Sequence, residues 1–425
     1  MKSLNLKAIT GILCLLLILP SCASGFLAGK STDLMKGIQP AQQGSIQAPD
    51  ERARKDINRF SSSLFVSEAE NQGNIMISPA SVYFALAMAL NGADQETKVK
   101  MLEVLAEKGV PADQVNKACR DWKAMLAKTG SKTTLDIANA IWYHQDFLPA
   151  QAFLQSNADS FGADARKLDF RDSSAPETIN QWISDATKGT IDQMIEAIDP
   201  AVVMYLINTV YFKSDWQTPF DKNQTQNQTF NTPKGPVETP FLHRIGDMAY
   251  FTGNGAQGVI LPYDDGSFAY FALLPDGQVT PREWIAQQEA DTLMETITGL
   301  LDRSSEYPTE LALPKYTARF EDSLKDELTK LGMGIAFDPE NADFSRMNES
   351  GEKNLYISEV KHKTYVRVDE KGTEASAATS VEVSVTSMPM FERKMVYDRP
   401  FIYGIMDTQT GVPLFLGILE DPVVR

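Results

Sequence analysis

The chain has 425 residues, with 40 Lys and Arg against 56 Asp and Glu, so its formal net charge is −16. Its 43 % apolar and 23 % charged residues are typical of a globular protein and exclude disordered and collagen-like classes. The acidic balance excludes a nucleic-acid partner, three cysteines cannot build a disulfide framework, and three histidines leave little room for a His-rich metal site.

The chain begins with a targeting segment. Two lysines precede the apolar run Ala8–Leu19, which is too short to span a bilayer. The run ends in Leu19-Pro20-Ser21-Cys22, which resembles the bacterial lipobox. We therefore expect residues 1–21 to be a lipoprotein signal peptide and Cys22 to carry the lipid anchor. This places the protein at the bacterial cell envelope or surface, held to the membrane only by lipid. The alternative is an ordinary signal peptide cut nearby and a secreted protein.

A low-complexity stretch follows the anchor. Gly25–Pro49 is rich in Gly, Ser, Gln and Ala and has no apolar periodicity. We expect residues 22–51 to combine the anchor with a flexible tether. No long linker or break in composition follows, so residues 52–425 are expected to form one large domain.

Helical patterns dominate the start of this domain. Arg52–Glu68 has apolar residues on one helical face. Ser78-Pro79 has the order of a helix cap followed by proline, and the apolar run Ala80–Leu90 ends at Asn91-Gly92. Because that run is apolar on all sides, the helix is expected to be buried. A further helix is expected over Gln95–Glu107.

The later half is rich in strands. Short β-type runs bounded by Gly, Pro and Asp cover Met204–Phe212, Met248–Phe251, Gly258–Tyr263, Phe268–Leu274, Leu355–Val368 and Phe401–Asp407. Helical patterns interrupt them at Thr178–Thr187, Pro281–Leu301 and Glu321–Leu331. Because strands and helices mix without regular alternation, the expected fold class is α+β.

The sequence gives no support for an enzyme active site. Gly253–Gly258 matches the dinucleotide pattern GxGxxG, but a strand follows it where a phosphate site needs a helix N-terminus, so a hairpin turn is expected. The sequence contains no nucleophile elbow, Walker loop, HExxH or paired CxxC. Cys119 is expected to be a structural or partly exposed thiol. We expect no enzyme activity, no cofactor and no metal.

Two neighbouring segments alternate like strands. In Val360–Val368 the alternation puts His362 on the apolar face, which predicts a core histidine with hydrogen-bond partners. In Gly372–Val385 one face is small or β-branched and the other small or polar. Asp369–Gly372 has the composition of a turn, so the two segments could form a hairpin. Composition alone favours an ordinary sheet strand.

Several motifs together resemble the serpin family. The run Asp369–Thr379 is similar to the reactive-loop hinge of inhibitory serpins. Further matches follow in the family's order at Asn74–Ser81, Asn208–Trp216, Leu313-Pro314-Lys315, Asp398–Phe401 and Leu416-Gly417. The resemblance implies a single domain with about three β-sheets, surrounding helices and an exposed reactive-centre loop.

The resemblance also implies a function. Inhibitory serpins act as suicide substrates: a protease cleaves the reactive loop, forms an acyl-enzyme, and is trapped when the loop inserts into a sheet. The implied partner is a target protease, and the protein is expected to be a monomer. The implied hinge consists of Glu370, Gly372, Thr373, Glu374, Ala375, Ala377 and Thr379. Its inward positions Thr373, Ala375 and Ala377 are small, which favours insertion.

Two further clusters are implied by the resemblance. The shutter, a buried polar cluster where the sheet must part, consists of Ser78, Ser81, Asn208 and His362. The breach at the top of that sheet contains Trp216 and Lys315, with Lys315 and Glu370 as an ion pair.

The cleaved bond lies among Thr386, Ser387 and Met388 by the family's spacing. Because no Lys or Arg lies between Gly372 and Glu392, elastase-like serine endopeptidases are the expected targets. A papain-like cysteine protease and a non-inhibitory binding role are the alternatives. Basic residues near Trp122 (Lys117, Arg120, Lys123 and Lys128) are interpreted as a solvated helix face rather than a polyanion site.

Overall fold

A computed structural model describes residues 31–40, 47–128, 130–199, 202–373 and 392–423. Several predicted features lie outside these residues: the signal peptide, Cys22, the hinge positions Glu374, Ala375, Ala377 and Thr379, and the candidate cleavage positions Thr386, Ser387 and Met388. Among the residues that the structure describes, no helix has the length and apolarity needed to cross a bilayer.

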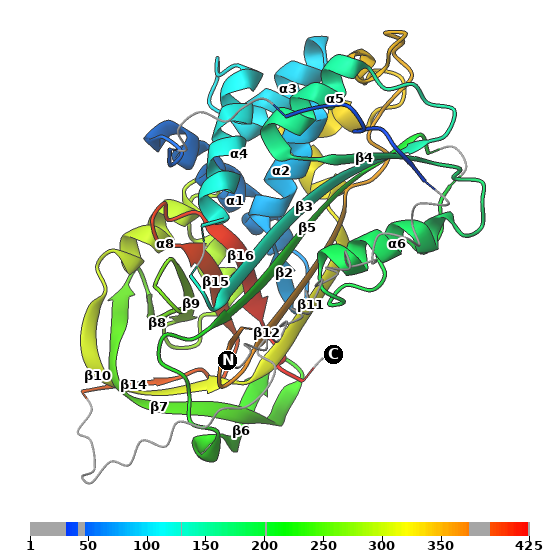
Figure 1. Cartoon of the computed structure of the whole chain (residues 1–425). Coiled ribbons are helices and arrows are strands. Elements are labelled where there is room, and N and C mark those ends of the chain that lie inside the picture. Colours follow the sequence, from blue (N-terminus) through cyan, green and yellow to red (C-terminus); the bar gives the residue numbers. More distant parts are fainter. Residues whose placement is uncertain (1–30, 41–46, 129, 200–201, 374–391, 424–425) are drawn as a thin grey trace, which may run out of the picture.

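The first sheet has seven strands and crosses the molecule diagonally (Figure 1). Its order is β1 (Thr32–Asp33), β4 (Asp164–Leu168), β3 (Thr133–His144), β5 (Met204–Asp215), β13 (Gly372–Thr373), β12 (Lys361–Val368) and β11 (Tyr316–Ser323). The long antiparallel pair of β3 and β5 runs from Thr133 opposite Ser214 to Tyr143 opposite Met204. This pair lies in the middle of the strand order.

The second sheet has nine strands. Its order is β14 (Arg393–Val396), β10 (Ser305–Pro314), β7 (Gly235–Gly253), β8 (Ala256–Pro262), β9 (Phe268–Pro275), β15 (Phe401–Asp407), β16 (Pro413–Leu419) and β2 (Ile75–Ile77), while β6 (Gln226–Thr232) pairs with β7. The 19 residues of β7 pair first with β6, then with β10 and finally with β8. Strand β7 thereby connects β6, β10 and β8 within this one sheet.

Helices pack on both faces of the first sheet. The helices are α1 (Glu51–Glu68), α2 (Pro79–Leu90), α3 (Gln95–Leu105), α4 (Ala112–Leu126), α5 (Gln151–Phe161), α6 (Ala175–Ala186), α7 (Pro281–Ala286), α8 (Leu293–Leu301) and α9 (Lys325–Leu328). Helices α7 and α8 contact strands of the second sheet. Alternate residues of β3 serve two cores, with Ile141 and Tyr143 in the main core and Ala140 and Trp142 in a smaller core that includes α6. This mixture of helices and sheets confirms the α+β prediction.

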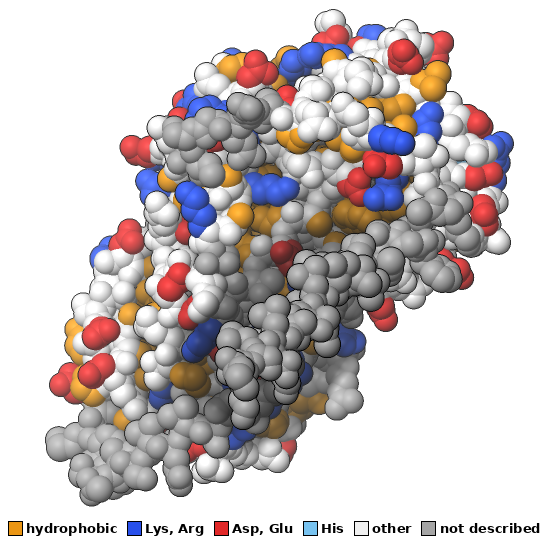
Figure 2. All heavy atoms as spheres, in the orientation of Figure 1, with side chains coloured by type: hydrophobic (Ala, Val, Ile, Leu, Met, Phe, Trp, Pro, Cys, Tyr) orange, Lys and Arg blue, Asp and Glu red, His pale blue; other side chains and the backbone are white. Residues whose placement is uncertain are grey.

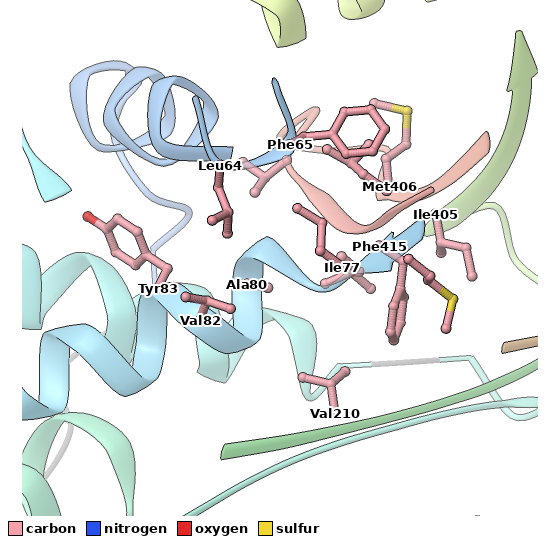
Figure 3. Packing of buried hydrophobic residues seen from close by; sticks show 14 of the residues in the cluster. Leu64, Phe65, Ile77, Ala80, Val82, Tyr83, Val210, Ile405, Met406 and Phe415 are labelled. Carbon is pink, nitrogen blue, oxygen red and sulfur yellow. The ribbon is translucent and has the colours of Figure 1, made fainter. Parts of the chain in front are cut away.

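Helix α2 forms as its sequence predicts. Ser78 caps it by accepting a hydrogen bond from the backbone N–H of Ser81 at 3.3 Å, Pro79 is its first residue, and Ala85 is its only residue that is not buried. Figure 3 shows α1 and α2 packed on β2, β15 and β16, with Leu64 and Phe415 among the buried side chains. Each such side chain contributes roughly 1.5–3 kcal/mol through burial.

Tertiary contacts move some predicted boundaries. The predicted helix over Pro281–Leu301 is two helices, because the backbone N–H of Met294 donates to Ser62 Oγ of α1 and thereby starts α8 anew. The predicted strand over Leu355–Val368 begins only at Lys361, because Ile357 donates to the carbonyl of Ala336 instead of to a strand.

The predicted helix over Glu321–Leu331 was also wrong at its start. Strand β11 continues through Ser323 by pairing with β12, and the following α-helix spans only Lys325–Leu328. The glycine-rich motif was predicted correctly as a hairpin turn: Gly253 pairs with Ala256, and Asn254 and Gly255 have φ values of 49° and 71°.

Part of the segment assigned to the tether lies on the domain. Residues Thr32 and Asp33 pair antiparallel with β4, and the N–H of Leu34 donates to the carbonyl of Ala165 at 2.9 Å. Ile38 is 8 % exposed and belongs to the main core. Residues 31–40 therefore add an edge strand to the first sheet and an apolar side chain to the main core.

Candidate functional site

The start of the predicted hinge is a short strand inside the first sheet. In β13, Gly372 lies opposite Asp215, and Thr373 lies opposite both Ser214 of β5 and Val368 of β12. The pairing of Val368 with Thr373 agrees with the first residues of the predicted hairpin, and Glu374–Val385 lie outside the described residues. A Cβ atom on Gly372 would lie 1.9 Å from the carbonyl oxygen of Ser214, so only glycine fits there.

In the part of the chain that the structure describes, the two strands on either side of β13 are not paired with each other. Strands β5 and β12 are both antiparallel to β13, so they run parallel to each other. Among the described residues, only the two residues of β13 join them by a strand ladder. Toward the far end of the gap, a cavity of about 50 Å³ lies between β5 and residues 356–361, above Ala85 and Ala89 of α2. The gap thus has the orientation that an additional antiparallel strand needs.

Trp216 holds the turn that precedes β13. Its backbone N–H donates to the carbonyl of Lys371 at 2.6 Å, and its indole N–H donates to the carbonyl of Asp369 at 2.9 Å. The indole stacks on Tyr263 with ring centroids 4.5 Å apart. The Tyr263 hydroxyl shares a hydrogen bond with Oγ1 of Thr373, which is completely buried. No local sequence pattern predicts this position for Tyr263.

The predicted ion pair between Lys315 and Glu370 is present. Lys315 Nζ lies 2.9 Å from Glu370 Oε2, and Thr225 Oγ1 donates to Glu370 Oε1 at 3.0 Å. The Glu370 side chain is only 7 % exposed, against 33 % for Lys315. Burial acts to raise the pKa of Glu370, but the hydrogen bond with Lys315 and the positive charge offset it and leave that pKa below its usual value. The pair therefore holds a buried carboxylate at the hinge.

The four predicted shutter residues form two hydrogen-bonded pairs on the N-terminus of α2. Ser81 Oγ donates to Asn208 Oδ1 on β5, and the backbone N–H of Ser78 donates to His362 Nε2 on β12 at 3.0 Å. One helix end thus binds the two strands that flank the gap. Asn139 of β3 extends the first pair: it accepts from Asn208 and donates to the carbonyl of Phe161.

His362 is the core histidine that its alternation predicts. It is 4 % exposed, and its Nε2 accepts a hydrogen bond, which requires the neutral ring. Burial lowers its pKa to about 4. Neighbouring Thr364 donates to the carbonyl of Met76, which adds a second contact between β12 and the segment leading into α2.

The basic residues near Trp122 and the thiol of Cys119 do not form a functional site among the described residues. Lys117 and Arg120 of α4 both pair with Asp121, and Lys123 donates to the carbonyl of Phe161. Figure 2 shows acidic and basic side chains interspersed over the visible face, without an extended basic area. Cys119 is a buried free thiol, and burial raises its pKa, so it lacks the thiolate character of a nucleophile.

Known proteins are similar to this chain in sequence. The family model for serpins, described as serine protease inhibitors, matches residues 55–422. A serpin-like protein of Thermococcus kodakarensis is 32 % identical over 378 residues, covering 86 % of this chain and 85 % of that protein. The leukocyte elastase inhibitor of Homo sapiens is 29 % identical over 375 residues, covering 86 % of this chain and 98 % of that protein.

Solved structures share the fold. The thermophilic serpin tengpin in its native state gives a TM-score of 0.85 at 34 % identity, covering 92 % of this chain and 100 % of that chain. The latent state of tengpin gives a TM-score of 0.77, covering 88 % and 99 %. On the family match, the relatives and the sheet arrangement together, the chain belongs to the serpin family.

Proposed function

We propose that this protein inhibits proteases as a suicide substrate. The observation that carries the proposal is the position of β13: two hinge residues already lie between two parallel strands, and among the described residues no other strand joins those two strands. A longer segment entering there antiparallel would form hydrogen bonds on both sides. Each of these bonds contributes about 0.5–1.5 kcal/mol net, so a fully inserted strand gains several kcal/mol.

The chemical step belongs to the protease. Its nucleophile attacks the carbonyl carbon of Thr386, Ser387 or Met388, an ester or thioester forms, and the peptide bond breaks with release of a new amino terminus. The C-terminal fragment stays in the fold, because β14, β15 and β16 belong to the second sheet. The acylated N-terminal fragment is then free to insert and to carry the protease along the first sheet.

The closed state needs a restraint before cleavage. We assign this role to Ser78, Ser81, Asn208 and His362, which tie β5 and β12 to one helix end, and to Trp216, Lys315 and Glu370, which hold the turn before Thr373. The chain gives a TM-score of 0.85 with tengpin in its native state and of 0.77 with tengpin in its latent state.

Elastase-like serine endopeptidases are the proposed targets. The loop between Gly372 and Glu392 contains no Lys or Arg, and a related human protein is named as an inhibitor of leukocyte elastase. The test is incubation with elastase, trypsin and a papain-like protease, followed by denaturing electrophoresis and sequencing of the released C-terminal fragment. A denaturant-stable complex with elastase supports the proposal. Clean cleavage by every protease contradicts it and favours a binding role.

We also propose that Cys22 is acylated, on the lipobox-like run that ends there. Metabolic labelling with a fatty acid in a bacterial host should label the wild-type chain and not Cys22→Ser. Equal labelling of both chains contradicts the anchor.

A further inference from the structure

Basic residues flank the reactive loop but do not occur within it. The nearest are Lys371 before Gly372, and Arg393 and Lys394 after Glu392. A trypsin-like protease cleaves after Lys or Arg, so these three residues decide whether such an enzyme finds a site at the loop. Each of them is tied to a sheet.

Arg393 lies between two aromatic rings. The central carbon of its guanidinium is 5.6 Å from the ring centroid of Tyr250 on β7 and 5.0 Å from that of Tyr307 on β10. The two rings meet edge to face at 6.0 Å. Both contacts have the distance of a cation–π interaction. Because Arg393 as a residue is exposed, these contacts and its backbone pairing are what keep its side chain from a protease.

The backbone at this position is also held. Arg393 lies opposite Thr309 in the parallel pair of β14 with β10, and the N–H of Glu392 donates to the carbonyl of Pro308 at 2.7 Å. Lys394 pairs with Glu310 at 3.1 Å. A protease needs an extended, detached segment whose side chain can enter its specificity pocket, so cleavage after Arg393 requires this strand start to open.

The remaining basic residue is held on the other side of the loop. The carbonyl of Lys371 accepts a hydrogen bond from the backbone N–H of Trp216. The backbone N–H of Lys371 donates to Asp369 Oδ1 at 2.9 Å. Trypsin-like cleavage at either end of the loop therefore requires these hydrogen bonds and contacts to break first.

We propose that Tyr250 and Tyr307 are specificity-determining residues, which hold Arg393 at the C-terminal base of the loop and thereby deny trypsin-like proteases a cleavage site. This inference rests on the proposed function only in taking the loop as the segment that proteases meet. The loop itself contains no Lys or Arg, but an accessible Arg393 would give trypsin a cleavage site next to it. By holding Arg393, the two tyrosines would keep the whole region resistant to trypsin.

The test is limited trypsin digestion of the purified protein, with the masses of the fragments measured under denaturing conditions. The double variant Tyr250→Leu/Tyr307→Leu keeps apolar bulk at both positions and removes the cation–π contacts. Two such contacts at an exposed site correspond to about five- to thirtyfold in the open population, so cleavage after Arg393 should accelerate by that factor.

Two controls make the result specific. Tyr365→Leu removes the same type of contact from Arg319 on the first sheet, where the distance is 5.5 Å, and should leave cleavage after Arg393 unchanged. Adding Arg393→Gln to the double variant should abolish the new fragment. Circular dichroism of each variant verifies that the fold is retained.

Wild-type cleavage after Arg393 as fast as in the double variant would overturn the proposal, as would equal acceleration in Tyr365→Leu. The assay does not require trapping. Clean cleavage of the loop by every protease, without a stable complex, would therefore contradict the proposed function without changing this result.

Discussion

The side chains of Tyr263 and Thr373 share a hydrogen bond across 110 residues of sequence, at the point where the hinge enters the first sheet. Both groups are buried, so removing one leaves the other without its partner. We expect Tyr263→Phe to lower the free energy of unfolding by about 1–3 kcal/mol. Urea unfolding of Tyr263→Phe, Thr373→Val and the double variant measures the coupling, and additive effects would contradict it.

Thr373 should also decide between inhibition and simple cleavage. Its side chain is 0 % exposed between β5 and β12, so an arginine there would place an unpaired charge in the core. We expect Thr373→Arg to be cleaved by elastase without forming a denaturant-stable complex, whereas Thr373→Ser retains the complex. The ratio of complex to cleaved protein on a denaturing gel is the measurement, and an unchanged ratio in the arginine variant would rule out insertion at this position.

The ion pair of Lys315 and Glu370 should show a defined pH dependence. The pKa of Glu370 is lower in the fold than in the unfolded chain, so its contribution is present above the unfolded value near 4.5 and is lost as pH falls through the folded value. Lys315→Met should therefore cost about 1–3 kcal/mol at pH 7, after allowing for the partial exposure of Lys315, and less at pH 3. Lys394→Met, which breaks the more exposed pair with Glu310, is the matched control and should cost about 0–1 kcal/mol.

His362 should make the fold sensitive to acid. Its pKa falls from about 6.5 in the unfolded chain to about 4 in the fold, so the unfolded chain binds the proton first. The stability from the neutral ring is present above pH 6.5 and declines as pH falls to 4, by about 3 kcal/mol in total. His362→Gln should flatten that part of the stability curve measured in urea. A parallel curve in the variant would show that His362 does not carry the effect.

Glu68 at the end of α1 should act in the opposite direction. Its carboxyl is fully buried, accepts from Asn71 Nδ2 at 3.1 Å, and has Asp322 and Glu327 nearby. Burial raises its pKa to about 7, so the folded chain keeps a proton that the unfolded chain loses near pH 4.5, and stability falls as pH rises from 4.5 to 7. Glu68→Gln should stabilise the protein by about 2–3 kcal/mol at pH 8 and by little at pH 4. A loss of stability at pH 8 would contradict this assignment.

Local patterns in the sequence predict much of the site. The order Ser78-Pro79 predicts the start of α2, and the alternation around His362 predicts its burial, because both depend on neighbouring residues. Tyr263 and Asn139 could not be predicted in the same way. Their roles depend on which strand lies beside which, and no spacing within one segment reports that.

The position of residues 31–40 could not be predicted from local sequence patterns either. Their composition indicates a tether, yet Thr32 and Asp33 pair with β4 and Ile38 enters the core. Ile38 is apolar, but no periodicity identifies its partner, so only the folded domain determines where it packs.

The docked N-terminal segment also limits how far the domain can stand from its proposed anchor. The antiparallel pairing of Thr32 with Lys167 places Ser31 toward the end of β4 that lies away from β13 along the sheet. Counting from Cys22 to Ser31 gives 31 − 22 = 9 residues, which can span at most about 30 Å. If Cys22 is acylated as proposed, the end of the first sheet opposite β13 lies near the membrane. Strand β13 then lies at the end of the sheet that is farther from the membrane. An incoming protease would then be captured on the outer side and delivered, by insertion, to the side that faces the lipid.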